Sequence, residues 1–297
     1  MPRPIAALIL LLCTMVWGLA FVAQKSAMDS MGPLTFSGLR FLLGGLLISP
    51  LAIRELRRSK VRLTPHQWRV AILMCLVFLA GSLLQQYALT MTTVTNSGFL
   101  TGLYVFFVPL IGLLVARIVP HPIVWLGAPV AMFGIFLLNG GNFANANLGD
   151  GLLVVSAVLW ALHMLLLGHL ARTTGLPILL SVMTFLIAGV LSSIAAIPLE
   201  APQLSGIANG WLEIAYAGCL STAVAFTGQA IAQQYIPSAN AAIILSAESL
   251  LAALGGAIIL HERLPPIGYL GAALIFCAIL AVETIPPLWA RRRPQFA

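Results

Sequence analysis

The segment QQYALTMTTVTN at residues 85–96 is matched, 144 residues further along the chain, by QAIAQQYIPSAN at residues 229–240. Both segments begin with glutamine and end with asparagine. The same offset aligns Cys75 with Cys219, Pro122 with Pro266, Gly127 with Gly271 and Trp125 with Tyr269, while Trp17 and Trp160 match to within one position. Chance identities between leucines would prove nothing, but matched Gln, Asn and Pro residues indicate that the chain is an internal duplication.

Apolar residues fill most of the chain. Hydrophobic residues make up 60% of the 297 residues, charged residues make up 8%, and the mean hydropathy is +1.03, whereas a soluble domain carries roughly 25% charged residues. A helix that crosses a bilayer needs about 20 apolar residues. Ten such windows are present, at 5–28, 33–53, 67–91, 95–117, 122–139, 150–171, 177–199, 210–235, 238–260 and 266–289. The first is too long for a signal peptide and lacks a clear cleavage site, so we expect it to be a transmembrane helix.

Each half of the duplication holds five of these windows. Because five is odd, a unit that begins on one side of the bilayer ends on the other, and the second unit inserts in the opposite orientation. The sequence therefore predicts an all-α polytopic membrane protein of ten transmembrane helices in two inverted repeats, at 1–140 and 149–290, with a basic tail at 291–297. Such folds place a substrate site near the bilayer midplane, where the two halves meet.

The basic residues predict the orientation, because lysine and arginine favour cytoplasmic loops. The loop after the second window is the richest in them, with Arg54, Arg57, Arg58, Lys60 and Arg62, and the chain ends in three arginines at 291–293. We expect a multi-pass protein of the cell (inner) membrane with both termini in the cytoplasm. The net charge of +7 is thus a topology signal, and we expect no nucleic-acid partner.

Signatures of catalysis and metal binding are missing from the sequence. The four cysteines, Cys13, Cys75, Cys219 and Cys277, lie inside apolar windows and form no CxxC pair, so helix packing is their expected role. There is no HExxH, GxSxG or P-loop motif, and no repeated acidic ring of the kind that ion channels use. We expect neither an enzyme nor a channel, and no metal or cofactor.

Two ionisable side chains lie deep inside apolar windows. Glu248 is about ten residues from either end of its window, where an ionisable group is costly unless it is paired, hydrated or protonated. Its position in the first repeat is held by Tyr104. Glu248 would bind a proton or a substrate amine, or it would pair with a basic side chain. Arg40 would clamp a carboxylate, serve as the counterion of Glu248, or extend to the lipid headgroups.

Aromatic and polar side chains within the windows are further candidates for a cavity. Trp17 and Trp160 lie in the middle of their windows and would form two aromatic walls, or pack between helices. Gln85 and Gln229 belong to polar stripes that would bond between helices or line a wet pathway. His163, one turn from Trp160, would pack in the interior or carry protons.

One basic residue near a window end has a local candidate partner. Lys25 lies four residues before Asp29, and oppositely charged residues at that spacing face each other on a helix. We expect the two side chains to pair.

Five stretches of the chain form a recognisable set: WGLAFVAQK at 17–25, LRFLLGG at 39–45, NSGFLTGLYVFFVPL at 96–110, SANAAIILSAESLLAALGG at 238–256 and HERLPPIGYLG at 261–271. This set resembles the EamA-type ten-helix transporters of the drug/metabolite transporter superfamily. The resemblance covers nearly the whole chain. It implies ten helices in inverted repeats, a central cavity, cytoplasmic termini and export of small organic metabolites. Positions in the family signatures are matched by Trp17, Arg40, Tyr104 and Glu248.

Together these observations predict a secondary transporter that exports a small organic metabolite, an amino acid or derivative, by alternating access. The alternative is another small solute: a quaternary ammonium compound or drug, a sugar, a nucleotide sugar or a purine. The predicted cavity residues are Trp17, Arg40, Gln85, Tyr104, Trp160, His163, Gln229 and Glu248, with Glu248 or His163 as the site of any proton coupling. We expect the protein to act in the bilayer as a monomer or homodimer.

Overall fold

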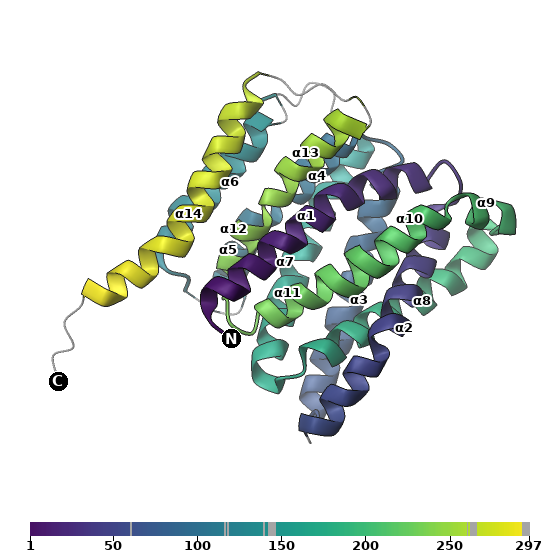
Figure 1. The fold of residues 1–297 in the computed structure, drawn as a ribbon, viewed down its shortest axis with the longest axis horizontal. Coiled ribbons are helices and arrows are strands. Elements are labelled where there is room, and N and C mark those ends of the chain that lie inside the picture. Colours follow the sequence, from purple (N-terminus) through teal and green to yellow (C-terminus); the bar gives the residue numbers. More distant parts are fainter. Residues whose placement is uncertain are drawn as a thin grey trace.

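The computed structural model describes residues 1–59, 61–115, 117, 119–138, 140–141, 147–259, 261 and 266–292, and over these residues it consists of helices and the turns that join them. The helices of the first half are α1 (Arg3–Ala27), α2 (Pro33–Ser59), α3 (Pro65–Ala88), α4 (Val94–Thr101), α5 (Tyr104–Leu114) and α6 (Pro122–Leu138). Figure 1 shows them packed together with the helices of the second half in one bundle.

The second half opens with α7 (Leu148–Thr174) and α8 (Pro177–Glu200). It continues through α9 (Leu204–Asn209), α10 (Trp211–Ala215), the π-helix η1 (Tyr216–Phe226), α11 (Thr227–Ala232), α12 (Ser238–Leu245), α13 (Ala247–Ile259) and α14 (Gly268–Arg292). The predicted basic tail at 291–297 is thus divided: Arg291 and Arg292 continue α14, and residues 293–297 lie outside the described residues.

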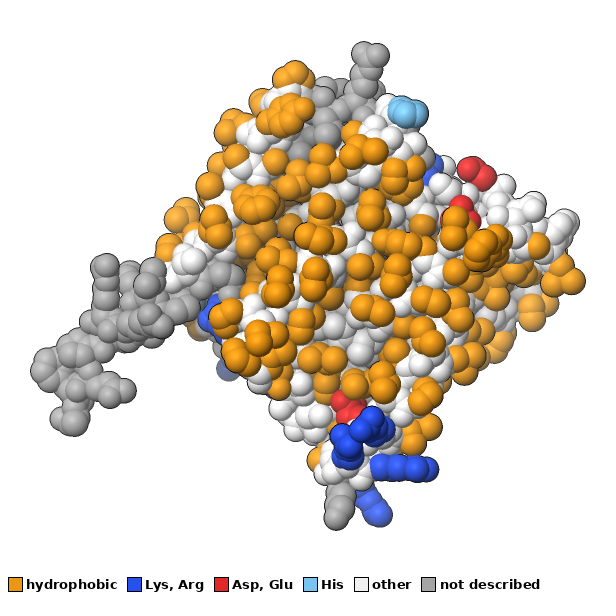
Figure 2. All heavy atoms as spheres, viewed as in Figure 1, with side chains coloured by type: hydrophobic (Ala, Val, Ile, Leu, Met, Phe, Trp, Pro, Cys, Tyr) orange, Lys and Arg blue, Asp and Glu red, His pale blue; other side chains and the backbone are white. Residues whose placement is uncertain are grey.

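Eight helical stretches of the described chain are long and apolar enough to cross a membrane. Three of them combine shorter helices: Val94–Leu114, Trp211–Ala232 and Ser238–Ile259. The windows predicted at 122–139 and 266–289 correspond to shorter apolar helices, Pro122–Leu137 and Gly268–Val282. Figure 2 shows hydrophobic side chains over most of the visible face, with one group of Lys and Arg side chains at the lower end. This surface is suited to a lipid environment, and the protein is an integral multi-pass membrane protein.

Helices α2 and α8 begin 144 residues apart, at Pro33 and Pro177, and they form the most extensive contact among the described helix pairs. Near the end of α2, Glu55 accepts hydrogen bonds from the backbone N–H groups of Ile178 and Leu179, at 3.2 and 2.8 Å. The first N–H groups of a helix have no partner within the helix and attract negative charge. Glu55 therefore caps the start of α8.

The end of α8 caps the start of α2 in the same way. Glu200 accepts hydrogen bonds from the N–H groups of Leu34 and Thr35, both at 2.8 Å, and from the Thr35 hydroxyl at 2.6 Å. The last turn of each helix thus meets the first turn of the other. This arrangement requires α2 and α8 to lie antiparallel, as the ribbons in Figure 1 do.

The central helices form two groups related by the internal offset. Helix α1 packs mainly against η1, α11, α12 and α13, which we call the α1 group. Helix α7 packs mainly against α3, α4 and α5, which we call the α7 group. Each group therefore combines the first long helix of one half with two later stretches of the other half.

Two of the predicted apolar windows, 95–117 and 238–260, are each divided by a tight turn. After α4, the N–H of Val105 bonds to the Gly102 carbonyl at 3.1 Å, and after α12 the N–H of Ser249 bonds to the Ser246 carbonyl at 3.2 Å. These i to i+3 bonds replace the wider α-helical pattern. Gly102 and Ser246 are 144 residues apart, so both interruptions fall at one position of the repeat.

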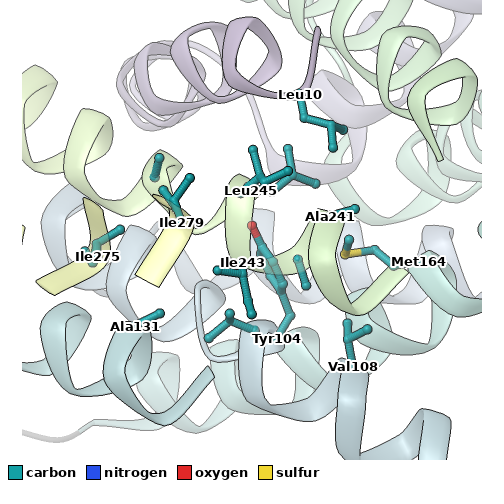
Figure 3. Packing of buried hydrophobic residues seen from close by; sticks show 14 of the residues in the cluster. Leu10, Tyr104, Val108, Ala131, Met164, Ala241, Ile243, Leu245, Ile275 and Ile279 are labelled. Atoms are coloured by element: carbon teal, nitrogen blue, oxygen red, sulfur yellow. The ribbon is translucent and has the colours of Figure 1, made fainter. Parts of the chain in front are cut away.

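The largest buried cluster joins the two halves around these interruptions. Lipid tails are as apolar as leucine, so close packing rather than exclusion of water holds such a cluster together. Figure 3 labels ten of its members, which come from α1, α5, α6, α7, α12 and α14: Leu10, Tyr104, Val108, Ala131, Met164, Ala241, Ile243, Leu245, Ile275 and Ile279.

Candidate functional site

A cavity lies between the α1 group and the α7 group, near the middle of both long helices. The volume open to water-sized molecules is about 50 Å³, which is room for a few waters. Its walls are formed by Trp17, Phe21, Gln24, Arg40, Gln85, Thr101, Tyr104, Trp160, Met164, Ser221, Phe226, Gln229, Leu245 and Glu248. All of these except Arg40, which comes from α2, belong to the two groups.

Most of the cavity wall is built from pairs that the internal duplication relates. An offset of 144 pairs Gln85 with Gln229, Thr101 with Leu245 and Tyr104 with Glu248, and an offset of 143 pairs Trp17 with Trp160 and Phe21 with Met164. The cavity thus lies where the two halves meet. The remaining wall residues, Gln24, Arg40, Ser221 and Phe226, have no such counterpart in the wall.

The helix interruptions place four of these side chains in the wall. Thr101 and Tyr104 flank the turn between α4 and α5, while Leu245 and Glu248 flank the turn between α12 and α13. Figure 3 shows the Tyr104 side chain extending from α5 toward Leu245. Broken helices near the middle of the membrane are a common way to build a transporter site.

Arg40 is a buried cation that forms no ion pair with any described residue. Its side chain is 4% exposed, and its Nη1 donates to Gln24 Oε1 at 2.9 Å. The guanidinium lies over the rings of Phe41 and Phe36, with distances of 4.5 and 5.3 Å from Cζ to the ring centroids. Its Nε has no hydrogen-bond partner among the described residues. A charge held in this way retains capacity for an anionic ligand.

Glu248 supplies the carboxyl group of the same cavity. It is 5% exposed, and Tyr104 lines the same cavity. The buried Tyr104 hydroxyl has no hydrogen-bond partner among the described residues. The contact between Arg40 and Glu248 that the sequence left open is not formed: Arg40 bonds to Gln24, and no ion pair joins these two described residues.

Phe226 connects the two predicted aromatic walls. Its ring centroid lies 4.6 Å from that of Trp17 and 5.6 Å from that of Trp160, and the second pair is stacked at 14°. The Trp17 Nε1 donates to the Ser221 carbonyl at 3.3 Å, and the Trp160 Nε1 donates to Gln85 Oε1 at 2.8 Å. Phe226 therefore joins the two indoles into one aromatic side of the cavity wall.

The two glutamines predicted for the site differ in their bonding. Gln85 accepts the indole N–H of Trp160, so it bonds between helices and also lines the cavity. Gln229 Oε1 is buried without a hydrogen-bond partner among the described residues. A buried amide oxygen without a partner is costly, and a polar ligand group or water in the cavity would satisfy it.

His163 is not part of the cavity wall. It is 3% exposed, and its ring packs against Phe78 with centroids 5.1 Å apart and edge-on to Trp160 at 5.9 Å. Its Nδ1 lies 3.5 Å from the Met74 carbonyl oxygen. The structure thus brings seven of the eight predicted cavity residues together and places His163 behind the Trp160 ring.

The sequence interpretation missed half of the wall, for two different reasons. Phe21 and Met164 could have been found by applying the tryptophan offset to their neighbours, since each lies four residues after a wall tryptophan. Phe226 gives no signal, because phenylalanine is ordinary in an apolar helix. Among the described residues, no group of three or more His, Cys, Asp or Glu side chains could hold a metal ion.

The family profile of the EamA-like transporters matches residues 4–140 and again residues 147–284. This chain belongs to the EamA-like transporter family. Among curated relatives of this EamA-like transporter, an uncharacterized transporter of Archaeoglobus fulgidus is 29% identical over 95% of the chain and 86% of that protein. The uncharacterized inner membrane transporter YedA of Escherichia coli K12 is 24% identical over 90% of the chain and 87% of that protein.

Similarity to a solved structure extends over the whole EamA-like fold. A protein known from a crystal structure shares 19% sequence identity with this chain and superposes with a TM-score of 0.78, covering 98% of this chain and 99% of the other. The overall architecture described above is therefore one that an experimental structure also adopts.

Proposed function

We propose that this EamA-like transporter exports a small zwitterionic metabolite, an amino acid or a derivative, by alternating access around the central cavity. The observation that carries the proposal is that Arg40 and Glu248 line one cavity without pairing with each other. A guanidinium binds a carboxylate through two parallel hydrogen bonds, and a buried carboxylate binds an ammonium group. A zwitterion supplies both partners at once.

The apolar wall completes the proposed binding mode. The side chain of the ligand would lie against Trp17, Phe226 and Trp160, whose rings already contact one another. The space in this structure is too small for such a ligand, so we interpret the structure as a closed form that must widen to accept it.

We further propose that ten helices cross the membrane as two inverted repeats, with both termini in the cytoplasm. The reciprocal caps support this arrangement, because Glu55 and Glu200 perform the same task at opposite ends of an antiparallel helix pair. The paired wall residues and the matched helix interruptions support it as well. Alternating access then follows from rocking of the α1 group against the α7 group.

Of the two residues considered for proton coupling, we assign the role to Glu248. It lines the cavity and is accessible to a ligand or to water there, whereas His163 is enclosed by Phe78 and Trp160. A quaternary ammonium compound is the second candidate, because Glu248 and the aromatic wall are suited to a cation. Arg40 disfavours a cation that carries no carboxylate.

The test is binding to the purified protein, measured as a ligand-induced rise in the melting temperature. We expect free amino acids to stabilise the protein, and the matching amines, N-acyl derivatives and quaternary ammonium compounds not to do so. Arg40→Gln should abolish the response, while Arg54→Gln, on the exposed end of α2, should retain it. Stabilisation by amines and quaternary ammonium compounds but not by amino acids would contradict the zwitterion proposal and favour the second candidate.

A further inference from the structure

Two cationic side chains make matching contacts at matching places in the two halves. Lys25, in the last turn of α1, donates from Nζ to the carbonyl oxygens of Leu89 and Thr92, at 2.7 and 3.1 Å. Arg172, in the last turn of α7, donates from Nη1 to the carbonyl oxygen of Gln233 at 3.3 Å. Leu89 and Gln233 are 144 residues apart and end α3 and α11, respectively.

The Lys25 contact corrects a sequence expectation. Lys25 was expected to pair with Asp29 on its own helix, but its ammonium group instead reaches the turn between α3 and α4. The final carbonyl groups of a helix lack partners within the helix and carry partial negative charge, so they attract cations. The same attraction accounts for the Arg172 contact with the end of α11.

Both contacts cross the boundary between the two helix groups. Lys25 belongs to the α1 group and bonds to the end of α3 in the α7 group. Arg172 belongs to the α7 group and bonds to the end of α11 in the α1 group. The cavity lies along this boundary, so each contact ties together the two parts that must separate for a ligand to enter.

The contacts lie at opposite ends of the cavity. Arg172 lines a second pocket together with Arg3, at the start of α1. Lys25 lies near the other end of α1, 22 residues further along, which corresponds to about 33 Å of helix. That separation is similar to the thickness of the hydrocarbon core of a bilayer.

The Arg172 contact stands between two spaces. On one side is the second pocket, with a volume of about 430 Å³, which Arg172 and Ser238 help to line. On the other side is Met164, a residue of the central cavity wall. The Gln233 side chain lies between them and donates from Nε2 to the Met164 carbonyl at 3.1 Å and to the Ser238 hydroxyl at 3.2 Å. Loosening this end would join the pocket to the cavity.

We propose that Lys25 and Arg172 are the two gates of the transporter, each closing one end of the cavity, and that each open state breaks one contact and keeps the other. The proposal rests on the alternating access of the proposed function. The structure, with both contacts formed and a cavity of about 50 Å³, is then the closed state between the two open ones. With the termini in the cytoplasm, Arg172 closes the cytoplasmic end.

The experiment measures access to the cavity from each side of the membrane. A Thr101→Cys reporter places a thiol in the cavity wall, and a membrane-impermeant maleimide is applied to intact cells or to inside-out vesicles. The same chain without the reporter gives the background from the native cysteines. Lys25→Met and Arg172→Met remove each charge but keep an unbranched side chain, and Arg54→Met removes an exposed charge as the matched control.

We expect Lys25→Met to speed labelling from outside about tenfold and to slow labelling from the cytoplasmic side, because the population shifts between the two open states. We expect Arg172→Met to do the reverse, with Arg54→Met unchanged. A tenfold shift in the ratio of the two open states corresponds to roughly 1.4 kcal/mol. The loss of one charged contact can account for a change of this size. Lys25→Arg and Arg172→Lys should restore most of the original pattern.

If Lys25→Met and Arg172→Met changed the labelling rate equally from both sides, or not at all, the proposal that these residues are gates would be wrong. A poorly folded protein would label faster from both sides. Labelling that becomes faster from one side and slower from the other therefore distinguishes gating from misfolding. Labelling does not require transport, so the two proposals can fail separately. If the two variants change the labelling rates in opposite directions but no amino acid binds, the gate proposal holds and the proposed ligand is wrong. If the directions are opposite but the two sides of the membrane are exchanged, the gate proposal holds and the proposed orientation is wrong.

Discussion

Gln24 controls the charge that Arg40 offers to the cavity. Its amide oxygen accepts from the guanidinium, while its Nε2 donates to the Ala20 carbonyl at 3.1 Å, which fixes the amide in that orientation. A neutral acceptor holds the arginine in place without cancelling its charge. An amide at position 24 therefore leaves the charge of Arg40 available to a ligand, whereas a carboxylate there would neutralise it.

We expect Gln24→Glu to weaken the binding of a carboxylate ligand by at least about tenfold, because an ion pair would form where a neutral hydrogen bond now lies. Gln24→Met keeps the length of the side chain and leaves the arginine charged, so its effect should be smaller. Ligand titration followed by the fluorescence of Trp17 and Trp160, which line the cavity, measures both variants. Equal losses in the two variants would contradict this role of charge.

The sequence identifies buried side chains more reliably than it identifies those that line the cavity. Trp17, Arg40, Tyr104 and Glu248 could be selected because polar or bulky groups are unusual at the centre of an apolar helix. His163 met the same criterion and lies behind the wall. The sequence identifies side chains whose burial is unusual. For His163, the rotation of α7 about its axis decides whether the side chain lines the cavity or packs in the interior.

At the scale of elements, the close approach of α4 to α13 depends on the absence of side chains. A Cβ atom added at Gly98 would lie 2.7 Å from the Cβ of Ala252. The Ser249 hydroxyl donates to the Gly98 carbonyl at 2.7 Å, so a side chain of α13 is bonded to the backbone of α4 at this point. Hydropathy windows predicted both helices but not their interruptions, because an average over 20 residues conceals a single tight turn.

We expect Gly98→Ala to destabilise the protein by about 1–3 kcal/mol, since the added methyl group must push α4 away from α13. Gly151→Ala is the matched control, because a Cβ at Gly151 in α7 meets no atom within 4 Å; it should be neutral or stabilising by up to about 1 kcal/mol. Thermal unfolding in detergent compares the two variants. The same loss of stability in both would show that helix approach is not the cause.

The capped pair α2 and α8 gives a second prediction for elements. Glu55→Gln and Glu200→Gln should each destabilise the fold by roughly 1 kcal/mol, because each replaces a charged acceptor at a helix start. Asp29→Asn, at an exposed position, should change stability by less than about 0.5 kcal/mol. Melting temperatures of the three variants provide the measurement. A clear loss in only one of the two capping variants would argue against equivalent roles.

For the whole molecule, overproduction should release one class of amino acid into the medium, and Glu248→Gln should abolish this release. The physical reason is that the variant removes the carboxylate that Glu248 contributes to the cavity wall. Metabolite analysis of the medium tests this expectation, with Glu213→Gln, a carboxyl group outside the cavity wall, as the control. Release that persists in Glu248→Gln would leave the transporter intact but would assign Glu248 a structural role.

The duplication was the most productive signal for the whole molecule, because offsets of 143 and 144 residues relate the wall pairs, and an offset of 144 relates the two helix interruptions and the starts of α2 and α8. Its departures matter as much as its matches. A cavity lined only by equivalent pairs would accept a ligand in two orientations related by half a turn. Tyr104 occupies the position in the first repeat that Glu248 occupies in the second, and Arg40 has no counterpart in the wall. One orientation of the ligand is therefore favoured. A zwitterion so bound meets three unlike surfaces, namely a cation, a carboxylate and an aromatic face, and three unlike points of contact are what distinguish a molecule from its mirror image.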